Sequence, residues 1–260
     1  METASKDRIL ANYRRVIGQI DQAARSVGRD PGEIKLVVVT KGHPIEAVSQ
    51  AIAAGLRLFG ENYAEEGIQK MVAFSEQEHL EWHMIGHIQS RKAHLVCENY
   101  QFVHSLDSLK LANRLDRCMS SANPALLEMD TQAPSKLAHR LPVLLECNVS
   151  GEETKFGWQA WNETGWENLL DDIIRILALP NLEVLGLMTM APFLPDPEQV
   201  RPFFRRLRQL QLYLRQQLPQ SDLRELSMGM SDDFMVAIQE GATLVRIGTA
   251  IMGPRPGRSG

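Results

Sequence analysis

One lysine in this chain directly follows a strongly apolar segment. Lys41 comes after the run 36–40 (Leu-Val-Val-Val-Thr) and before Gly42, His43 and Pro44. An amine at the apolar end of a buried strand is partly desolvated, which disfavours the ammonium form and lowers its pKa. A lysine of lowered pKa can condense with an aldehyde or ketone to form an imine. The alternative is an ordinary surface lysine in a connecting loop.

Two turns rich in glycine and hydroxyl side chains occur later in the chain. One contains Ser227, Met228, Gly229 and Ser231, and the other contains Gly248 and Thr249. Each follows an apolar, strand-like segment and precedes a possible helix start, where free backbone N–H groups can meet an anion. The turns therefore favour a phosphate group close to Lys41. As an alternative, Ser231 caps the helix that follows it.

Arg246 adds a cation beside the second turn. Alternation along the segment 243–248 places Leu244, Arg246 and Gly248 on one face of a buried strand. A guanidinium among apolar neighbours needs a partner. Either it belongs to a structural ion pair, or it donates to an atom of a ligand.

A histidine pair elsewhere superficially resembles a metal site. His83 and His87 stand four residues apart, but Gly86 interrupts them and the glutamate of a His-Glu-x-x-His motif is missing. The sequence therefore predicts no metal site.

The elements that must position these residues alternate regularly. Apolar, β-branched runs predict eight strands, each except the last followed by a segment of helical periodicity. The predicted strands are 35–40, 56–60, 81–85, 101–104, 142–148, 182–188, 224–227 and 243–247. The predicted helices between them are 44–55, 63–78, 89–98, 107–119, 161–179, 198–217 and 231–240. This series predicts an α/β fold of the (β/α)8 TIM barrel type, with an open doubly wound sheet as the alternative.

The rest of the chain fits one domain. Residues 5–27 predict an extra amino-terminal helix that closes the barrel floor, and 120–140 predict a long surface connection on the face away from the site. We expect a single barrel domain over 1–253, followed by a flexible tail at 254–260.

Composition limits the partners and the compartment. The 260 residues include 28 Lys plus Arg against 32 Asp plus Glu, which argues against a nucleic-acid surface or an anionic-membrane surface. No segment approaches the roughly 18 consecutive apolar residues of a membrane span. The three cysteines are an odd number and form no Cys-x-x-Cys pair. We therefore expect a cytoplasmic protein.

Seven segments together resemble the YggS/PROSC family of pyridoxal phosphate homeostasis proteins. The similarity runs from about residue 5 to residue 253. The segments are Val39-Thr40-Lys41, Phe59-Gly60-Glu61-Asn62-Tyr63, 82–89, 148–157, Gly186-Leu187-Met188-Thr189-Met190, 226–231 and 245–253.

The resemblance implies a barrel similar to the amino-terminal domain of alanine racemases, with pyridoxal 5′-phosphate bound covalently. By this similarity Lys41 is the Schiff-base lysine and Arg246 faces the pyridine nitrogen. The implied cofactor-binding positions are Lys41, Asn62, Ser227, Met228, Ser231, Arg246, Gly248 and Thr249.

Three functions follow as hypotheses. The first is a non-catalytic carrier or buffer of pyridoxal phosphate, expected to be a monomer that supplies apo-enzymes. An amino-acid racemase-like enzyme is the second, although the chain has no room after Gly253 for the β domain that supplies a catalytic tyrosine in the resembled racemases. The third is a barrel enzyme in which Lys41 forms imines with sugar carbonyls.

Overall fold

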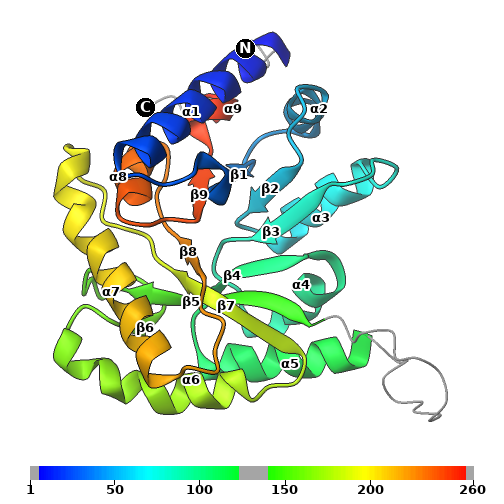
Figure 1. Cartoon of the computed structure of the whole chain (residues 1–260). Helices are drawn as coiled ribbons and strands as arrows, with labels where there is room; N and C mark the ends of the chain where they lie inside the picture. The colour runs from blue at the N-terminus through cyan, green and yellow to red at the C-terminus, as the bar shows by residue number, and fades with distance from the viewer. Residues whose placement is uncertain (1–5, 123–139, 256–260) are drawn as a thin grey trace.

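The computed structural model describes residues 6–122 and 140–255. Eight parallel strands form a closed barrel, because β1 pairs with both β2 and β9, and β4 pairs with β5 (Figure 1). The barrel strands are β1 Lys35–Val39, β2 Leu58–Glu61, β3 Glu81–Met84, β4 Phe102–Leu106, β5 Leu141–Asn148, β7 Leu182–Met188, β8 Glu225–Ser227 and β9 Leu244–Ile247. The predicted (β/α)8 barrel is confirmed, and the open sheet is wrong.

Helices surround the barrel on its outer face (Figure 1). They are α1 Lys6–Ser26, α2 Ile45–Ala53, α3 Ala64–Ala73, α4 Ala93–Asn99, α5 Leu109–Ala122, α6 Leu170–Leu177, α7 Arg201–Gln217, α8 Phe234–Gln239 and α9 Thr249–Met252. Residues 6–122 and 140–255 also contain four 3₁₀ helices, at Pro31–Glu33, Ser90–Lys92, Glu163–Leu169 and Pro197–Val200. Within these described ranges, no helix combines the length and the apolar character that crossing a bilayer requires.

Two short elements were not expected. Strand β6, Trp158–Gln159, pairs with the end of β5 outside the barrel. Helix α9 follows β9, so the prediction that no helix follows the last strand is wrong. Both elements are too short to produce a periodic pattern in the sequence.

The amino-terminal helix lies in the outer ring. Helix α1 packs against α8, α9 and α2, so it fills the gap between the last and first helices of the ring rather than closing the floor. Asn12 Nδ2 donates a hydrogen bond to the carbonyl of Ile251, and Arg15 Nη2 donates to that of Ala250, both at 3.0 Å. The helix was predicted correctly but its place was not, because α9 is too short to occupy this position alone.

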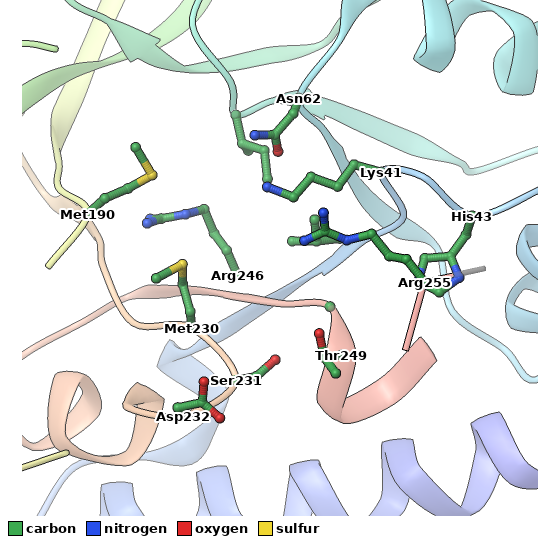
Figure 2. Close-up of a pocket in the computed structure, with 13 residues that line it drawn as sticks. Lys41, His43, Asn62, Met190, Met230, Ser231, Asp232, Arg246, Thr249 and Arg255 are labelled. Carbon is green, nitrogen blue, oxygen red and sulfur yellow. The ribbon is translucent and has the colours of Figure 1, made fainter. Parts of the chain in front are cut away.

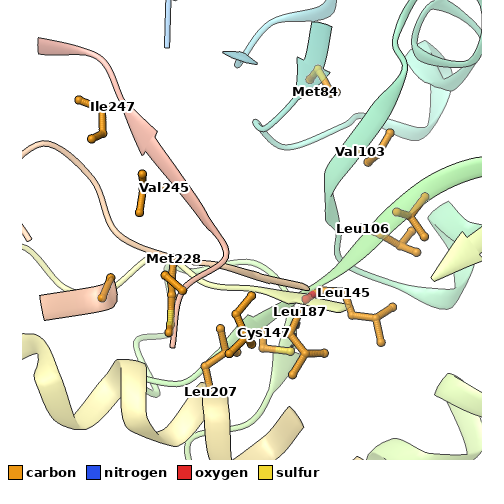
Figure 3. Packing of buried hydrophobic residues seen from close by; sticks show 14 of the residues in the cluster. Met84, Val103, Leu106, Leu145, Cys147, Leu187, Leu207, Met228, Val245 and Ile247 are labelled. Atoms are coloured by element: carbon orange, nitrogen blue, oxygen red, sulfur yellow. Dashed lines mark hydrogen bonds between the residues drawn. The ribbon is translucent and has the colours of Figure 1, made fainter. Parts of the chain in front are cut away.

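Alternate residues of the strands form two separate apolar layers. Side chains on the outer face, such as Val245, Ile247, Leu145 and Leu187, belong to one buried cluster with side chains of the helices. Figure 3 shows Leu207 of α7 near Leu187 and Cys147 of the strands. The inner face fills the barrel with a smaller cluster. Its buried members are Val37, Phe102, Leu144, Leu185, Met188 and Leu244. This inner layer lies on the same face of the strands as the polar residues that project into the barrel.

Two predicted segments lie largely outside the described residues. Of the predicted connection 120–140, residues 123–139 are not described, and of the predicted tail 254–260, residues 256–260 are not.

Two isoleucines of α1 test whether this helix is an integral part of the barrel. Ile20 is 3% exposed and Ile17 is 39% exposed. We expect Ile20→Ala to lower the free energy of unfolding by about 2 to 5 kcal/mol, because it leaves a cavity between α1 and its neighbours. Ile17→Ala should change it by no more than about 0.5 kcal/mol. Urea denaturation of both variants measures the difference, and equal small effects would show that α1 is dispensable.

Candidate functional site

A cavity of about 180 Å³ opens at the carboxyl ends of β1, β2 and β9. Figure 2 shows side chains from these strands and from the two glycine-containing turns around it. Six of the eight predicted site residues line this one cavity: Lys41, Asn62, Ser231, Arg246, Gly248 and Thr249. The structure therefore brings together residues that are up to 208 positions apart, from 41 to 249.

Lys41 places a primary amine at this cavity. No hydrogen bond or ion pair involves it among the residues that the structure describes. Burial lowers its pKa, and the cations of Arg255 and Arg246 lower it further, against the opposing charges of Glu61 and Glu66. Lys41 thus has the properties of a nucleophilic amine rather than those of an ordinary surface lysine.

A buried charge network fixes the backbone on either side of Lys41. Lys70 on α3 is 2% exposed, and its Nζ donates to the carbonyl of Thr40 and to Glu61 Oε1, both at 2.7 Å. Glu66 Oε1 accepts from Lys70 Nζ at 2.8 Å and from the backbone N–H of Gly42 at 2.6 Å. Both neighbours of Lys41 are therefore tied to α3.

Glu61 points away from the cavity and Asn62 lines it. The carboxyl of Glu61 is fully buried, and it also accepts a hydrogen bond from Thr40 Oγ1 at 2.5 Å. Asn62 comes next and lines the cavity. Its backbone lies so close to Gly86, in the turn after β3, that a side chain at Gly86 would meet it at 2.3 Å. In the Gly-Glu-Asn segment, Glu61 therefore stabilises the backbone next to Lys41, and Asn62 faces the cavity.

Arg246 lies inside the barrel, as strand alternation predicts. Its Nη1 donates to Ser227 Oγ at 2.6 Å and its Nη2 donates to the carbonyl of Thr189 at 2.9 Å. Burial lowers the pKa of the guanidinium to about 10, against the opposing charges of Asp233 and Glu146. It therefore stays cationic at neutral pH. Neither contact is a salt bridge, so within the described residues the structural ion pair, one of the two alternatives for Arg246, does not form.

The hydrogen bond to Ser227 continues across the whole barrel interior. Ser227 Oγ contacts His104 Nδ1, His104 Nε2 contacts His83 Nδ1, and His83 Nε2 contacts Glu81 Oε1, each at 2.8 Å. Burial lowers the pKa of both histidines, so both are neutral. Each ring then has one N–H and one free nitrogen.

Only one arrangement of protons satisfies every link if Glu81 is ionised. Arg246 donates to Ser227, Ser227 to His104 Nδ1, His104 Nε2 to His83 Nδ1, and His83 Nε2 to the carboxylate. The chain therefore has one direction, from the guanidinium at the cavity to the carboxylate at the opposite end of the barrel. His83 serves this chain, whereas His87 Nδ1 contacts Asp107 at 2.9 Å, so the two histidines do not share partners.

The two predicted anion-binding turns meet at Ser231. Its Oγ accepts a hydrogen bond from the backbone N–H of Ala250 in α9, at 3.2 Å. Helix α8 begins only at Phe234, so the alternative that Ser231 caps it is wrong. Gly229 has φ +95°, and a side chain there would meet Ala237 Cβ at 2.6 Å, so this turn requires glycine.

Two predicted residues do not line the cavity. Ser227 is fully buried and acts on the site through Arg246, and Met228 packs in the outer apolar layer. In contrast, Arg255 and His43 line the cavity although the sequence did not single them out. The sequence places Arg255 in the predicted tail, because nothing in the seven residues after Gly253 indicates that the chain folds back towards Lys41.

A second chamber adjoins the first. Its volume is about 320 Å³, and Asn62, Ile85 and Met190 line both chambers. Glu146 lines the second chamber but not the first. In a strand every second side chain points to the same face, so Leu144 inside the barrel implies that Glu146 also points inward. This alternation is the signal in the sequence that could have identified Glu146.

The comparisons with known proteins agree with this geometry. Residues 7–256 match the family described as alanine racemase, N-terminal domain. The pyridoxal phosphate homeostasis protein of Vibrio cholerae is 39% identical over 250 residues, which cover 95% of this chain and 96% of that protein. The chain belongs to the family of pyridoxal phosphate homeostasis proteins. The family member of Pseudomonas aeruginosa is 41% identical over 251 residues, covering 95% of this chain and 96% of its own length.

Solved structures place this family member among similar barrels. PipY of Synechococcus elongatus with pyridoxal phosphate bound is 32% identical, with a TM-score of 0.72 over 90% of this chain and 100% of PipY. An alanine racemase of Clostridium difficile has a TM-score of 0.65 at 16% identity, over 97% of this chain and 58% of the racemase, which shows a shared fold alone. The resemblance found in the sequence is thereby confirmed.

Glu146 gives a prediction on stability. Burial raises the pKa of its carboxyl to about 7, the charge of Asp107 adds to this, and Arg246 opposes it. A carboxyl whose pKa is higher in the folded state than in the unfolded state binds protons more tightly when folded. It therefore destabilises the fold progressively as pH rises from about 4.5 to about 7, and fully above that.

We expect Glu146→Gln to remove this loss. The variant should be more stable than the native protein by about 1 kcal/mol at pH 5 and about 3 kcal/mol at pH 8. Denaturant unfolding at the two pH values measures both differences. A gain that is the same at pH 5 and pH 8 would show that the carboxyl does not titrate in this range.

Proposed function

We propose that this protein binds pyridoxal 5′-phosphate as a Schiff base on Lys41 and acts as a non-catalytic carrier in pyridoxal phosphate homeostasis. The observation that carries the proposal is a lysine amine of lowered pKa that has no partner in the described part of the chain and lies in the same cavity as two turns bearing hydroxyl groups and glycines. PipY with pyridoxal phosphate bound, and the names of the curated relatives, support this ligand.

The residues present fit the cofactor. When bound, pyridoxal phosphate supplies an aldehyde that condenses with a primary amine, and Lys41 supplies that amine. Ser231, Gly248 and Thr249 would hold the phosphate, with Arg255 as an additional cation at the cavity. Asp232 also lines the cavity and is exposed, so solvent screens its repulsion of a phosphate.

The remaining predicted residues would act on the cofactor ring. Asn62 would approach the ring, and Arg246 would face its nitrogen. Ser227 would act by orienting Arg246. Met228 would contribute only through its backbone, because its side chain belongs to the apolar layer.

Arg246 supports a carrier over a catalyst. A guanidinium that keeps its charge at neutral pH disfavours a proton on a neighbouring ring nitrogen, which makes the ring a poorer acceptor of electrons from a substrate. In the described part of the chain, no tyrosine lines the cavity around Lys41. The relatives are named as homeostasis proteins and not as enzymes. The alternative, a racemase-like enzyme, rests on the shared fold.

The partners and the compartment follow from the carrier function. We expect the protein to be a monomer that gives its cofactor to apo-enzymes in the cytoplasm. Cys97, Cys118 and Cys147 are all free, which suits a reducing compartment.

Covalent trapping tests the assignment of Lys41. Borohydride treatment of the protein with pyridoxal phosphate should fix one cofactor on Lys41, and Lys41→Ala should lose this label. Lys92→Ala is the matched control, because Lys92 lies in the adjacent chamber and is paired with Glu65 at 2.5 Å. Peptide mass spectrometry locates the label. A label of equal yield in Lys41→Ala would refute the assignment.

Turnover assays separate the carrier from the enzyme. We expect the loaded protein to transfer pyridoxal phosphate to an apo-enzyme without racemising or transaminating common amino acids. Chiral chromatography and keto-acid detection measure the two reactions. Turnover near the roughly 1 to 10³ per second typical of enzymes would refute the carrier function.

A further inference from the structure

The second chamber contains a carboxyl group that the proposed cofactor site does not use. Glu146 lies on the inner face of β5 near its carboxyl end, and it is only 4% exposed. No hydrogen bond to its carboxyl exists among residues 6–122 and 140–255, and Oε2 is completely buried without a partner. Leaving a buried carboxylate unpaired costs free energy, so the fold retains a charge for which it provides no partner.

The other charged groups of the chamber are already paired. Lys92 Nζ contacts Glu65 Oε1 at 2.5 Å, and both line the chamber. His87 Nδ1 contacts Asp107 Oδ2 at 2.9 Å. Arg246 acts on Glu146 through its charge, but its Nη1 and Nη2 donate to other groups.

The walls beside Glu146 are largely apolar. Phe156 stacks on His87 with ring centroids 3.8 Å apart, and both rings line the chamber. Met84, Ile85 and Met190 also line it. An occupant that matches these walls has a short alkyl chain and one cationic end, because Glu146 is the charged group of the described lining that has no partner, and an anion would meet its carboxylate.

We propose that this chamber binds a primary ammonium group on an alkyl chain, with Glu146 as its counter-ion and hydrogen-bond acceptor. A charge-assisted hydrogen bond between an ammonium and a buried carboxylate is about twice as strong as a neutral one. The occupant would bond to Oε1, the carboxyl oxygen that is not completely buried, and would thereby give the carboxyl of Glu146 the partner that the described residues do not supply.

The position of the chamber suggests what a bound amine would do. Because Asn62, Ile85 and Met190 separate and line both chambers, an amine held at Glu146 lies next to the site of Lys41. An ammonium that gave one proton to the Glu146 carboxylate would become a free amine, the same functional group as Lys41. It would then replace Lys41 at the aldehyde carbon: its nitrogen would form a bond to that carbon, the bond from that carbon to Lys41 Nζ would break, and Nζ would take up the two hydrogens that the incoming nitrogen loses. This part of the inference rests on the proposed function and identifies the amine as the acceptor that draws the cofactor away.

Binding of n-butylammonium to the cofactor-free protein tests the inference. We expect isothermal titration calorimetry to show binding to the native protein, and Glu146→Gln to weaken it at least tenfold. Glu65→Gln removes the same charge from the same chamber, but from a carboxylate that already has a partner, and should change the affinity less than threefold. Because Glu146→Gln is expected to stabilise the fold, unfolding would not explain its loss of binding.

Two results would overturn the inference: equal affinity in the native protein and Glu146→Gln, or equally tight binding of n-butanol, which has the same shape without the charge. The assay contains no cofactor, so a failure of the Lys41 assignment leaves its outcome unaffected. Comparing Nα-acetyl-lysine amide with alanine amide then identifies the source of the amine. Tighter binding of the first assigns the chamber to a protein lysine, and tighter binding of the second assigns it to a free amino acid.

Discussion

A buried guanidinium is the constraint on which this barrel depends. Arg246 sits inside a closed ring of parallel strands, and its two nearest acceptors are a hydroxyl and a carbonyl rather than a carboxylate. Its charge is supported by the chain of hydrogen bonds through Ser227, His104 and His83 to Glu81. Because every link donates in the same direction, each proton position fixes the next. The polar interior is thus one connected unit that presents a cation to the cavity.

Lys41 is also positioned by hydrogen bonds of other residues. Lys41 itself makes no polar contact in the described structure, so its position depends on its neighbours in sequence. Lys70 and Glu66 hold Thr40 and Gly42, and Glu61 neutralises Lys70 in the interior. A salt bridge buried this deeply contributes little net stability, but removing one partner costs several kcal/mol. We infer that the salt bridges of Lys70 fix the backbone from Thr40 to Gly42 and leave the amine of Lys41 without a hydrogen bond in the described structure.

The sequence predicted the framework well and the contacts less well. Runs such as 36–40 and 182–188 are apolar because parallel strands are buried on both faces, so their pattern is visible without a structure. It could not show that α1 completes the outer ring, since that depends on the brevity of α9. Nor could it show that Met228 faces the helices, because a single turn residue has no periodic neighbours to fix its direction. Arg255 was missed for the same reason.

Charge is divided between the two chambers in a way that matches two different ligands. The first chamber presents the cations of Arg246 and Arg255 beside Lys41, and these cations lower the lysine pKa while favouring an anionic ligand. The second presents Glu146, whose buried carboxyl has no partner within the described residues. A phosphorylated aldehyde is complementary to the first environment, and an aliphatic amine is complementary to the second. Adjacent sites of opposite charge therefore allow an acceptor amine to approach a bound aldehyde without displacing the groups that hold its phosphate.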